Sequence, residues 1–320
     1  MKGNIFMKIV MLDIGTLGFD AVLSPLRNIG ETVEYTRTSP EEVSERIKDA
    51  DVVVVNKIKL GKNNLEGSKV RLICVSATGY DNIDTAYCSS HGIALCNVPG
   101  YSTESVAQLT LAMALSLATN LNPYGNFVHS GAYSESGVAN KVSPVFHEIS
   151  SLTWGIIGGG AIGTKVAEIA KAMGCNIIIC RRKKETRYPQ ADIDTLCKTA
   201  DIISVHTPLT EETKGLISRE RITSMKKGAI FINVARGAVA DEEALAEAIE
   251  KGHLGGLGVD VYSQEPFPKD HPFSRILNMD NVCLTPHMAW GAYEARNRCI
   301  EEMGKNISAF YAGEKRNRIV

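Results

Sequence analysis

The sequence lacks several features that would point to a specialised class of protein. It has no excess of charge of one sign, because 35 Lys and Arg residues face 36 Asp and Glu residues and the formal net charge is -1. This balance gives no broad basic surface, so composition does not indicate a nucleic-acid partner. Low-complexity tracts are absent, and the only repetition is an alternation of strand and helix patterns. We therefore expect a globular protein.

Long apolar runs and paired cysteines are also missing. The most apolar helix pattern, residues 105–118, contains polar residues such as Gln108 and Ser116, and it is too short and too polar to span a bilayer. Lys8 and Asp13 interrupt the apolar run near the N-terminus, so no secretory signal is indicated. The eight cysteines form no C-x-x-C pair, which favours free thiols over disulfides or zinc. We expect a cytoplasmic protein with no metal and no membrane association.

The patterns that are present indicate two α/β domains. The 320 residues and 44% hydrophobic content suffice for two cores. Apolar strand patterns alternate with helix patterns along the chain, which predicts doubly wound parallel sheets. The last helix pattern, 293–311, comes after the second sheet is complete and most economically returns to the first domain. We therefore predict a discontinuous substrate domain, residues 1–99 plus 288–320, and a dinucleotide-binding domain, residues 100–287.

Residues 152–163, L-T-W-G-I-I-G-G-G-A-I-G, carry the strongest local signal. They predict a buried strand that turns through Gly158, Gly160 and Gly163 into a helix beginning near Ala161. In this G-x-G-x-x-G pattern the first glycine permits a tight turn, the second lets backbone N–H groups approach a pyrophosphate, and the third lets the helix pack closely on the strand. The alternative is a glycine-rich turn in another α/β unit, but the flanking strands and helix favour a dinucleotide site.

Three side chains near predicted strand ends of the second sheet could act on a small anionic substrate. They are Arg236 in N-V-A-R-G, Glu265 in Q-E-P and His287 in T-P-H. Ligand clefts form at the strand ends of open α/β sheets. Arginine can bind a carboxylate bidentately, and a histidine paired with a carboxylate has its imidazolium form favoured, which suits a general acid. Judged on these residues alone, Arg236 and His287 could equally be ordinary surface or core residues.

Longer motifs accompany these residues, at 76–84 (S-A-T-G-Y-D-N-I-D), 97–107 (N-V-P-G-Y-S-T-E-S-V-A), 206–210 (H-T-P-L-T), 259–262 (V-D-V-Y) and 285–290 (T-P-H-M-A-W). With them, the sequence resembles the D-isomer-specific 2-hydroxyacid dehydrogenases over nearly the whole chain, and it is most similar to the glycerate dehydrogenase or hydroxypyruvate reductase branch. The resemblance implies two Rossmann-like or flavodoxin-like domains. It also implies NAD(P)-dependent reduction of a small 2-keto acid, hydroxypyruvate or glyoxylate, to the D-2-hydroxy acid by hydride transfer. A homodimer formed through the 105–118 helix and the following polar arm, residues 120–143, is implied as well.

The resemblance assigns roles to single residues. Arg236 matches the substrate-binding arginine, Glu265 the carboxylate partner and His287 the acid/base. Backbone N–H groups that would hold the substrate carboxylate are those of Ala77, Thr78 and Gly79. Cofactor contacts are implied at Thr103, Gly158, Gly160, Ala161, Ile162, Gly163, His206 (through its backbone), Pro208, Val234, Ala235, Asp260 (beside the nicotinamide amide) and Ala289.

The end of the second strand departs from the pattern of the family's NAD-preferring members. Those members carry an acid there, which would bind the ribose hydroxyls. This sequence has Arg181 followed by Arg182, and guanidinium groups would instead bind a 2′-phosphate. We therefore predict NADP(H) in preference to NAD(H). The alternative is that the basic run is a solvated loop and that Glu185 binds the ribose, although Glu185 lies past the expected strand end.

The same fold and similar site residues also occur in proteins with other functions. C-terminal-binding-protein corepressors resemble this fold and keep similar site residues, so a dinucleotide-sensing binding protein is one alternative, although no partner-binding tail follows the last helix. A short 3-phosphoglycerate dehydrogenase is another. Formate dehydrogenase is disfavoured because Glu265 stands in place of glutamine. The remaining histidines, His271 among them, follow no metal-ligand spacing, and we expect them to be surface or structural residues.

Overall fold

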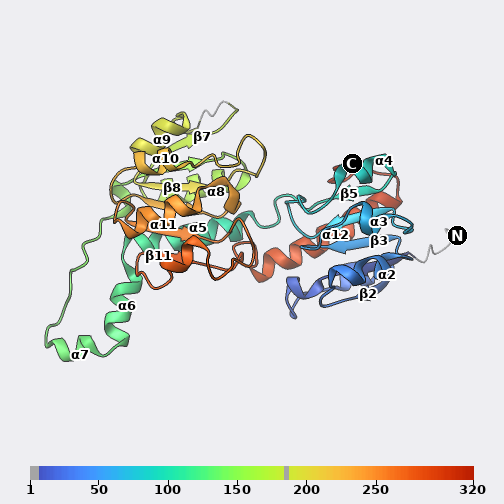
Figure 1. Ribbon diagram of the computed structural model, residues 1–320, viewed down its shortest axis with the longest axis horizontal. Helices are drawn as coiled ribbons and strands as arrows, with labels where there is room; N and C mark the ends of the chain where they lie inside the picture. Colours follow the sequence, from blue (N-terminus) through green and yellow to red (C-terminus); the bar gives the residue numbers. More distant parts are fainter. Residues whose placement is uncertain (1–6, 184–186) are drawn as a thin grey trace. The chain divides into compact units, whose positions relative to one another are not determined.

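The computed structural model of the protein describes residues 7–183 and 187–320, and its contacts divide the chain into two units (Figure 1). Unit 1 comprises Met1–Ser102 and Gly291–Val320, and unit 2 comprises Thr103–Trp290. Each unit contains one parallel sheet with helices, which confirms the predicted α/β class. Glu185, the alternative ribose ligand, lies outside the described residues.

Unit 1 is built on a five-stranded parallel sheet in the order β2-β1-β3-β4-β5. Three of these strands, β3, β4 and β5, are buried at every position, because helices cover both faces of a parallel sheet. The edge strand β2 is half-exposed. The strands are β1 (Lys8–Met11), β2 (Glu31–Glu34), β3 (Val52–Val55), β4 (Leu72–Val75) and β5 (Ala94–Cys96).

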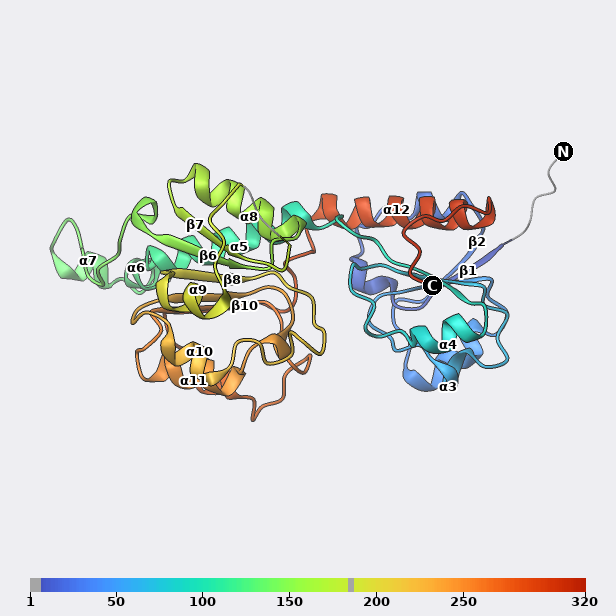
Figure 2. The ribbon, with the colours of Figure 1, turned by 90° about the horizontal axis from the view of Figure 1, so that it is seen from above.

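The long helix α12 (Tyr293–Tyr311) runs along one face of this sheet, and α3 and α4 lie on the other face (Figure 2). The C-terminal segment is tied to the sheet, because the N–H of Ile319 donates to the carbonyl of Leu95 at 2.8 Å. The side-chain amide of Asn306, on α12, donates to the carbonyl of Asn97 at 2.9 Å. The chain therefore returns to unit 1 after completing unit 2. The other helices are η1 (Ile14–Leu17), α1 (Ser24–Arg27), η2 (Pro40–Glu42), α2 (Val43–Ile47), α3 (Lys62–Leu65) and α4 (Thr85–Ser90).

Unit 2 contains a six-stranded parallel sheet in the order β11-β10-β9-β8-β6-β7. From β6 the chain goes to β7 on one side and then crosses to β8 on the other, so the strand order reverses at β6. Ligands of open α/β sheets bind outside the carboxyl ends of the strands at such a reversal. The strands are β6 (Thr153–Ile157), β7 (Asn176–Cys180), β8 (Ile202–Val205), β9 (Ile230–Asn233), β10 (Gly256–Val259) and β11 (Val282–Leu284).

Helices cover both faces of the six-stranded sheet (Figure 2). The helices α5 (Thr103–Ala118) and α8 (Ala161–Ala172) pack together on one face, and α9 (Ile193–Thr199), α10 (Arg219–Ser224) and α11 (Glu242–Glu250) lie on the other. Strand β10 carries two glycines because α5 approaches it closely. A Cβ atom on Gly258 would lie 3.2 Å from Met113, and one on Gly256 would lie 3.1 Å from Leu117.

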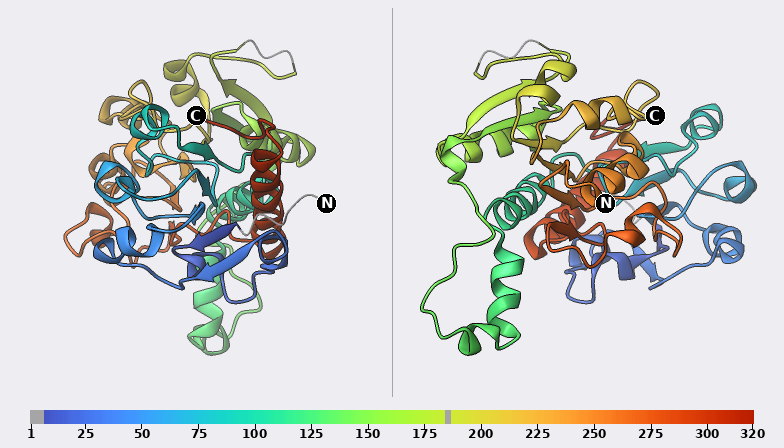
Figure 3. Two further views of the ribbon diagram at one scale, coloured as in Figure 1. Left: turned by 90° about the vertical axis from the view of Figure 1, so that its right-hand side faces the viewer. Right: turned by 60° about the vertical axis from the view of Figure 1, so that its left-hand side comes forward.

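Between α5 and β6, unit 2 extends into a projecting arm (Figures 1 and 3). It contains α6 (Leu121–His129) and α7 (Ala132–Ser136), followed by an extended return segment. No residue from 119 to 148 is buried, although the arm carries large apolar side chains. Val142 is 80% exposed and Val145 is 74% exposed.

Candidate active site

Segments that carry predicted site residues follow all six strands of unit 2. Because parallel strands end at the same edge of a sheet, these segments share one edge. The glycine turn follows β6, Arg181 follows β7, His206 follows β8, Arg236 follows β9, Glu265 follows β10 and His287 follows β11.

The glycine turn has the geometry of a phosphate-binding loop. Gly158 has φ 99°, in the left-handed region that favours glycine, and a Cβ atom there would lie 2.7 Å from the carbonyl carbon of His206. A Cβ atom on Gly163 would lie 2.0 Å from the carbonyl oxygen of Gly158, so this glycine is needed for the helix to pack on the turn. A Cβ atom on Gly160, at the N-terminus of α8, would have no heavy atom within 4 Å. The turn can therefore admit a pyrophosphate next to the N–H groups of the helix.

The two arginines after β7 lie in different surroundings. The side chain of Arg181 lies against the glycine turn, where a Cβ atom on Gly159 would be 2.8 Å from Cδ of Arg181. Arg182 forms an exposed ion pair with Glu212, with 2.9 Å between Nη1 and Oε2. Arg181 is thus the arginine beside the glycine turn.

His287 and Glu265 form a close pair. Nδ1 of His287 lies 2.6 Å from Oε2 of Glu265, and the side chains are 22% and 29% exposed. An ionised carboxylate can only accept, so Nδ1 carries the proton of this hydrogen bond and Nε2 faces away from Glu265. The other carboxylate oxygen, Oε1, accepts from the N–H of Tyr262 at 3.1 Å. Both oxygens of Glu265 are therefore held in place.

The backbone of His287 is in an unusual conformation, with φ 54°. Asp260 holds the surrounding segment, because its carboxylate accepts from the hydroxyl of Thr285 at 2.5 Å and from the two N–H groups after His287 at 2.8 and 2.9 Å. Burial raises the pKa of Asp260. The indole N–H of Trp290 donates to the carbonyl of His287 at 2.9 Å. These contacts fix the direction in which the imidazole points.

The segment after β9 is organised by Asn233. Its side-chain amide donates to the carbonyl of Arg236 at 2.9 Å, and its Oδ1 accepts from the N–H of Ala235 at 3.0 Å. The next residue, Gly237, packs directly on the turn that carries Glu265, because a Cβ atom there would lie 2.0 Å from the carbonyl carbon of Tyr262. The Arg236 and Glu265 segments are therefore in backbone contact.

His206 is unsuited to proton transfer. Its Nε2 lies 2.9 Å from the hydroxyl oxygen of Ser204, which also accepts from the indole N–H of Trp154 at 2.9 Å. Burial lowers the pKa of His206 to about 3, so the ring is neutral near pH 7. The predicted cofactor contact through its backbone stays a prediction.

A second histidine–carboxylate pair lies close to the first. Nε2 of His271 is 3.1 Å from Oε2 of Glu242, and the side chains are only 5% and 10% exposed. The sequence patterns assign no role to Glu242 and predict a surface or structural role for His271. They are 29 residues apart and neither directly follows a strand, so no local pattern links them.

The predicted substrate loop of unit 1, residues 77–79, follows β4. Its Thr78 hydroxyl donates to the carbonyl of Val98 at 2.9 Å, and the side-chain amide of Asn97 donates to the carbonyl of Thr78 at 2.7 Å. The N–H of Val98 donates to the carbonyl of Ala77 at 2.9 Å. The loop is thus fixed against the segment that follows β5.

The remaining expectations concern metals, membranes and thiols. Within residues 7–183 and 187–320, no group of three or more His, Cys, Asp or Glu residues could hold a metal ion. In the same part of the chain, no helix combines the length and apolar character needed to cross a membrane. All eight cysteines are free.

The reversal at β6, the glycine turn and the polar groups at the neighbouring strand ends define a nicotinamide-dinucleotide-dependent oxidoreductase with a doubly wound sheet. A family model described as "D-isomer specific 2-hydroxyacid dehydrogenase, NAD binding domain" matches residues 111–289. The chain belongs to the D-isomer-specific 2-hydroxyacid dehydrogenases and is a nicotinamide-dinucleotide-dependent enzyme that acts on 2-keto and 2-hydroxy acids.

Relatives match over nearly the full length. The chain is 34% identical to a glycerate dehydrogenase of Methylorubrum extorquens, over 97% of this chain and 98% of that protein. It is 33% identical to a hydroxypyruvate reductase of Blautia hydrogenotrophica, over 97% and 99% of the two chains. A crystal structure of D-lactate dehydrogenase from Aquifex aeolicus, complexed with NAD and lactic acid, matches with a TM-score of 0.84 and 30% identity, over 96% of each chain.

Proposed function

We propose that this enzyme reduces a 2-keto acid of the hydroxypyruvate or glyoxylate type to the D-2-hydroxy acid, with His287 as the acid/base. The observation that carries the proposal is the 2.6 Å pair of His287 and Glu265, on segments that follow the adjacent strands β11 and β10. Arg236 follows β9, which pairs with β10. The names of the two relatives, glycerate dehydrogenase and hydroxypyruvate reductase, support this substrate class.

The chain's own residues would bind the substrate and move one proton. Arg236 binds the carboxylate and the carbonyl side of the substrate, and backbone N–H groups of residues 77–79 bind the carboxylate. As the carbonyl carbon is reduced, negative charge develops on its oxygen. Protonated His287 donates a proton to that oxygen, and the carboxylate of Glu265 stabilises the imidazolium beforehand. In the oxidation direction, neutral His287 accepts the proton of the hydroxyl group.

The cofactor that we propose is NADP(H), which supplies the hydride when bound. Gly158, Gly160 and Gly163, with Ala161 and Ile162 of α8, would hold its pyrophosphate. Arg181 would bind the 2′-phosphate, and its side chain lies against the glycine turn, which supports this role. Further contacts are proposed at Thr103, Arg182, His206, Pro208, Val234, Ala235, Asp260 and Ala289.

We propose a homodimer formed through α5 and the arm, residues 119–148. The arm exposes Leu121, Val142, Val145 and Phe146, each more than half exposed. Several large exposed apolar side chains on one segment support an interface, because exposed apolar groups that are not scattered singly mark interaction sites. A second copy of the same chain is the partner that a closed symmetric oligomer provides.

A single set of assays tests substrate and cofactor together. Consumption of NADH or NADPH is measured with hydroxypyruvate, glyoxylate, pyruvate and 3-phosphohydroxypyruvate in parallel. We expect the highest kcat/KM with hydroxypyruvate or glyoxylate and NADPH. Preference for 3-phosphohydroxypyruvate would make the enzyme a short phosphoglycerate dehydrogenase. Tight cofactor binding without turnover of any of the four acids would instead favour a dinucleotide-sensing protein.

A further inference from the structure

The turn that carries Glu265 also accepts support from a second carboxylate, that of Glu242, which lies outside the turn. The N–H of Tyr262 donates to Glu265 itself, at 3.1 Å, and the N–H of the next residue, Ser263, donates to Oε1 of Glu242 at 2.9 Å. The hydroxyl of Ser263 donates to Oε2 of the same side chain. Glu242 is the first residue of α11, so this contact anchors the turn to a helix.

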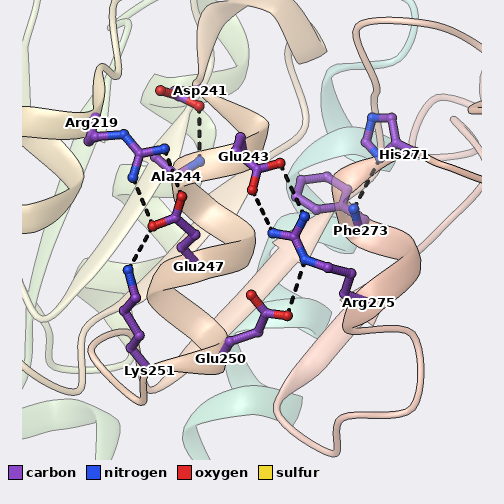
Figure 4. A network of polar contacts seen from close by, with 10 residues as sticks. All are labelled: Arg219, Asp241, Glu243, Ala244, Glu247, Glu250, Lys251, His271, Phe273 and Arg275. Atoms are coloured by element: carbon purple, nitrogen blue, oxygen red, sulfur yellow. Dashed lines mark hydrogen bonds and ion pairs between the residues drawn. The ribbon is translucent and has the colours of Figure 1, made fainter.

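His271 completes the set of donors to Glu242. Its Nδ1 accepts from the N–H of Phe273 at 3.2 Å, a contact visible in Figure 4, so the ring proton is on Nε2. Nε2 donates to Oε2 of Glu242 at 3.1 Å. The nearly buried carboxylate thus receives three hydrogen bonds, two from Ser263 and one from His271. A buried polar network is stable only when its members are satisfied in this way.

The ring of His271 also packs against aromatic residues that precede and follow Glu265 in the turn. Its centroid lies 6.1 Å from that of Tyr262, three residues before Glu265, and 4.8 Å from that of Phe267, two residues after it. The hydroxyl of Tyr262 donates to the carbonyl of Thr285 at 3.0 Å, in the segment that leads to His287. His271 therefore contacts Glu242 and the turn around Glu265. None of these contacts involves Glu265 or His287 directly.

We propose that His271 and Glu242 are positioning residues for the reaction, which hold the turn so that the Glu265 carboxylate stays within hydrogen-bond distance of His287. This inference rests on the proposed roles of Glu265 and His287. The bond between those two residues is 2.6 Å long, and a displacement of about 1 Å would remove it. Displacements of that size, caused by substitutions away from the reacting atoms, can lower turnover by up to about a hundredfold.

The variants that test the proposal are His271→Ala, which removes the donor, and Glu242→Gln, which keeps the shape of the side chain and removes an acceptor. We expect each to lower kcat by about tenfold or more, with KM for the 2-keto acid and cofactor affinity changed by less than about threefold. The conservative variant His271→Gln keeps an N–H donor and should recover most of the lost kcat. Near-parental kcat in both disruptive variants would overturn the proposal.

Matched controls lie at the two ends of α11. His253 contacts the carbonyl of Ile222 through Nε2 at 3.2 Å, and Glu243 pairs with Arg275 at 2.7 Å on the surface, beside the start of the helix (Figure 4). His253→Gln and Glu243→Gln should keep kcat within about twofold of the parent enzyme. A tenfold loss in the controls would assign the effect to α11 as a whole and overturn the specific role of the pair.

A double-mutant cycle separates positioning from general structural support. If His271 acts through Glu265, His271→Ala lowers kcat in the parent and has no further effect in the Glu265→Gln background. Equal losses in both backgrounds would overturn the inference. If Glu265→Gln alone leaves kcat unchanged, the proposed function fails. If it lowers kcat while neither His271→Ala nor Glu242→Gln does, only the inference fails.

Discussion

Nδ1 of His287 lies 2.6 Å from Oε2 of Glu265, although 22 residues separate the two positions. The parallel pairing of β10 with β11 explains this proximity, because Val259 and Leu284 are register partners and each lies just before the segment that carries one member of the pair. Asp260 then holds the segment of His287, and the N–H of Tyr262 holds Glu265. The pair is therefore built by sheet topology and fixed by backbone hydrogen bonds.

Loss of this pair should remove most of the activity. His287→Ala should lower kcat for reduction by about 10²–10⁴, because it removes the proposed proton donor. Glu265→Gln should have a smaller effect. Steady-state kcat for reduction and for oxidation measures the loss in both directions. His91→Ala, in unit 1, is the control. A near-normal rate for the His287→Ala enzyme would contradict the proposed mechanism.

Cofactor preference should depend on Arg181. Arg181→Asp replaces a group that attracts a 2′-phosphate by one that repels it, so we expect KM for NADPH to rise about tenfold or more and KM for NADH to fall. Arg187→Asp, which alters a surface arginine paired with Glu168 at 3.2 Å, should leave the preference unchanged. Equal or better kcat/KM with NADH in the parent enzyme would contradict the assignment of Arg181.

Sequence patterns predict the parts of this fold that depend on local conformation and continuous burial. The glycine turn falls in this group, since Gly158 and Gly163 have local steric reasons and Gly160 leaves open space at the start of α8. Strand β2 could not be predicted in this way, because Glu31–Glu34 has glutamates at both ends and lacks an apolar run. The strand lies half-exposed at a sheet edge. Parallel pairing explains why the segments after β9, β10 and β11 lie at one edge of the sheet and why Glu265 and His287 meet.

The support around the site could not be predicted in the same way. Glu242 begins a helix, and its contact with Ser263 depends on how α11 packs beside β10. His271 follows no strand and lies in an irregular segment before a short 3-10 helix. Neither spacing nor composition encodes such a contact, because it arises from tertiary packing between segments about twenty to thirty residues apart.

His206 should make the protein sensitive to acid. Its pKa is lowered to about 3 in the folded state by burial, against an ordinary value of 6.5, so below pH 6.5 the unfolded chain binds a proton that the folded chain does not. Stability should therefore fall as pH decreases, with His206 contributing about 2 kcal/mol of the loss at pH 5. His206→Gln should reduce the difference between urea unfolding at pH 7 and pH 5 by about that amount. An unchanged difference would show that the ring is protonated while folded.

The arm should control the oligomeric state. We expect sedimentation to give the mass of a dimer for the parent chain. Val142→Asp combined with Val145→Asp should shift it toward the monomer, because each substitution places a charge in the apolar interface. Phe19→Asp changes a side chain that is 97% exposed in unit 1 and serves as the matched control. A monomeric parent, or equal dissociation by the control, would argue against this interface.

Gly237 should be intolerant of any side chain, although it has no direct part in proton transfer. A Cβ atom there would lie 2.0 Å from the carbonyl carbon of Tyr262 and 2.1 Å from the nitrogen of Ser263, far inside van der Waals contact. Gly237→Ala must therefore push the Glu265 turn away from the Arg236 segment. We expect a loss of about 1–3 kcal/mol in stability and a fall in kcat of at least tenfold.

Thermal melting and steady-state kinetics measure the two effects of Gly237→Ala separately. The control is Gly125→Ala in α6, where a Cβ atom would meet no heavy atom within 4 Å. That variant should keep kcat and melt at the same temperature or slightly higher, since alanine favours the helix. If Gly237→Ala lowered the melting temperature but kept kcat, the turn would be able to move without displacing Glu265 from His287, and backbone packing would then matter for stability alone.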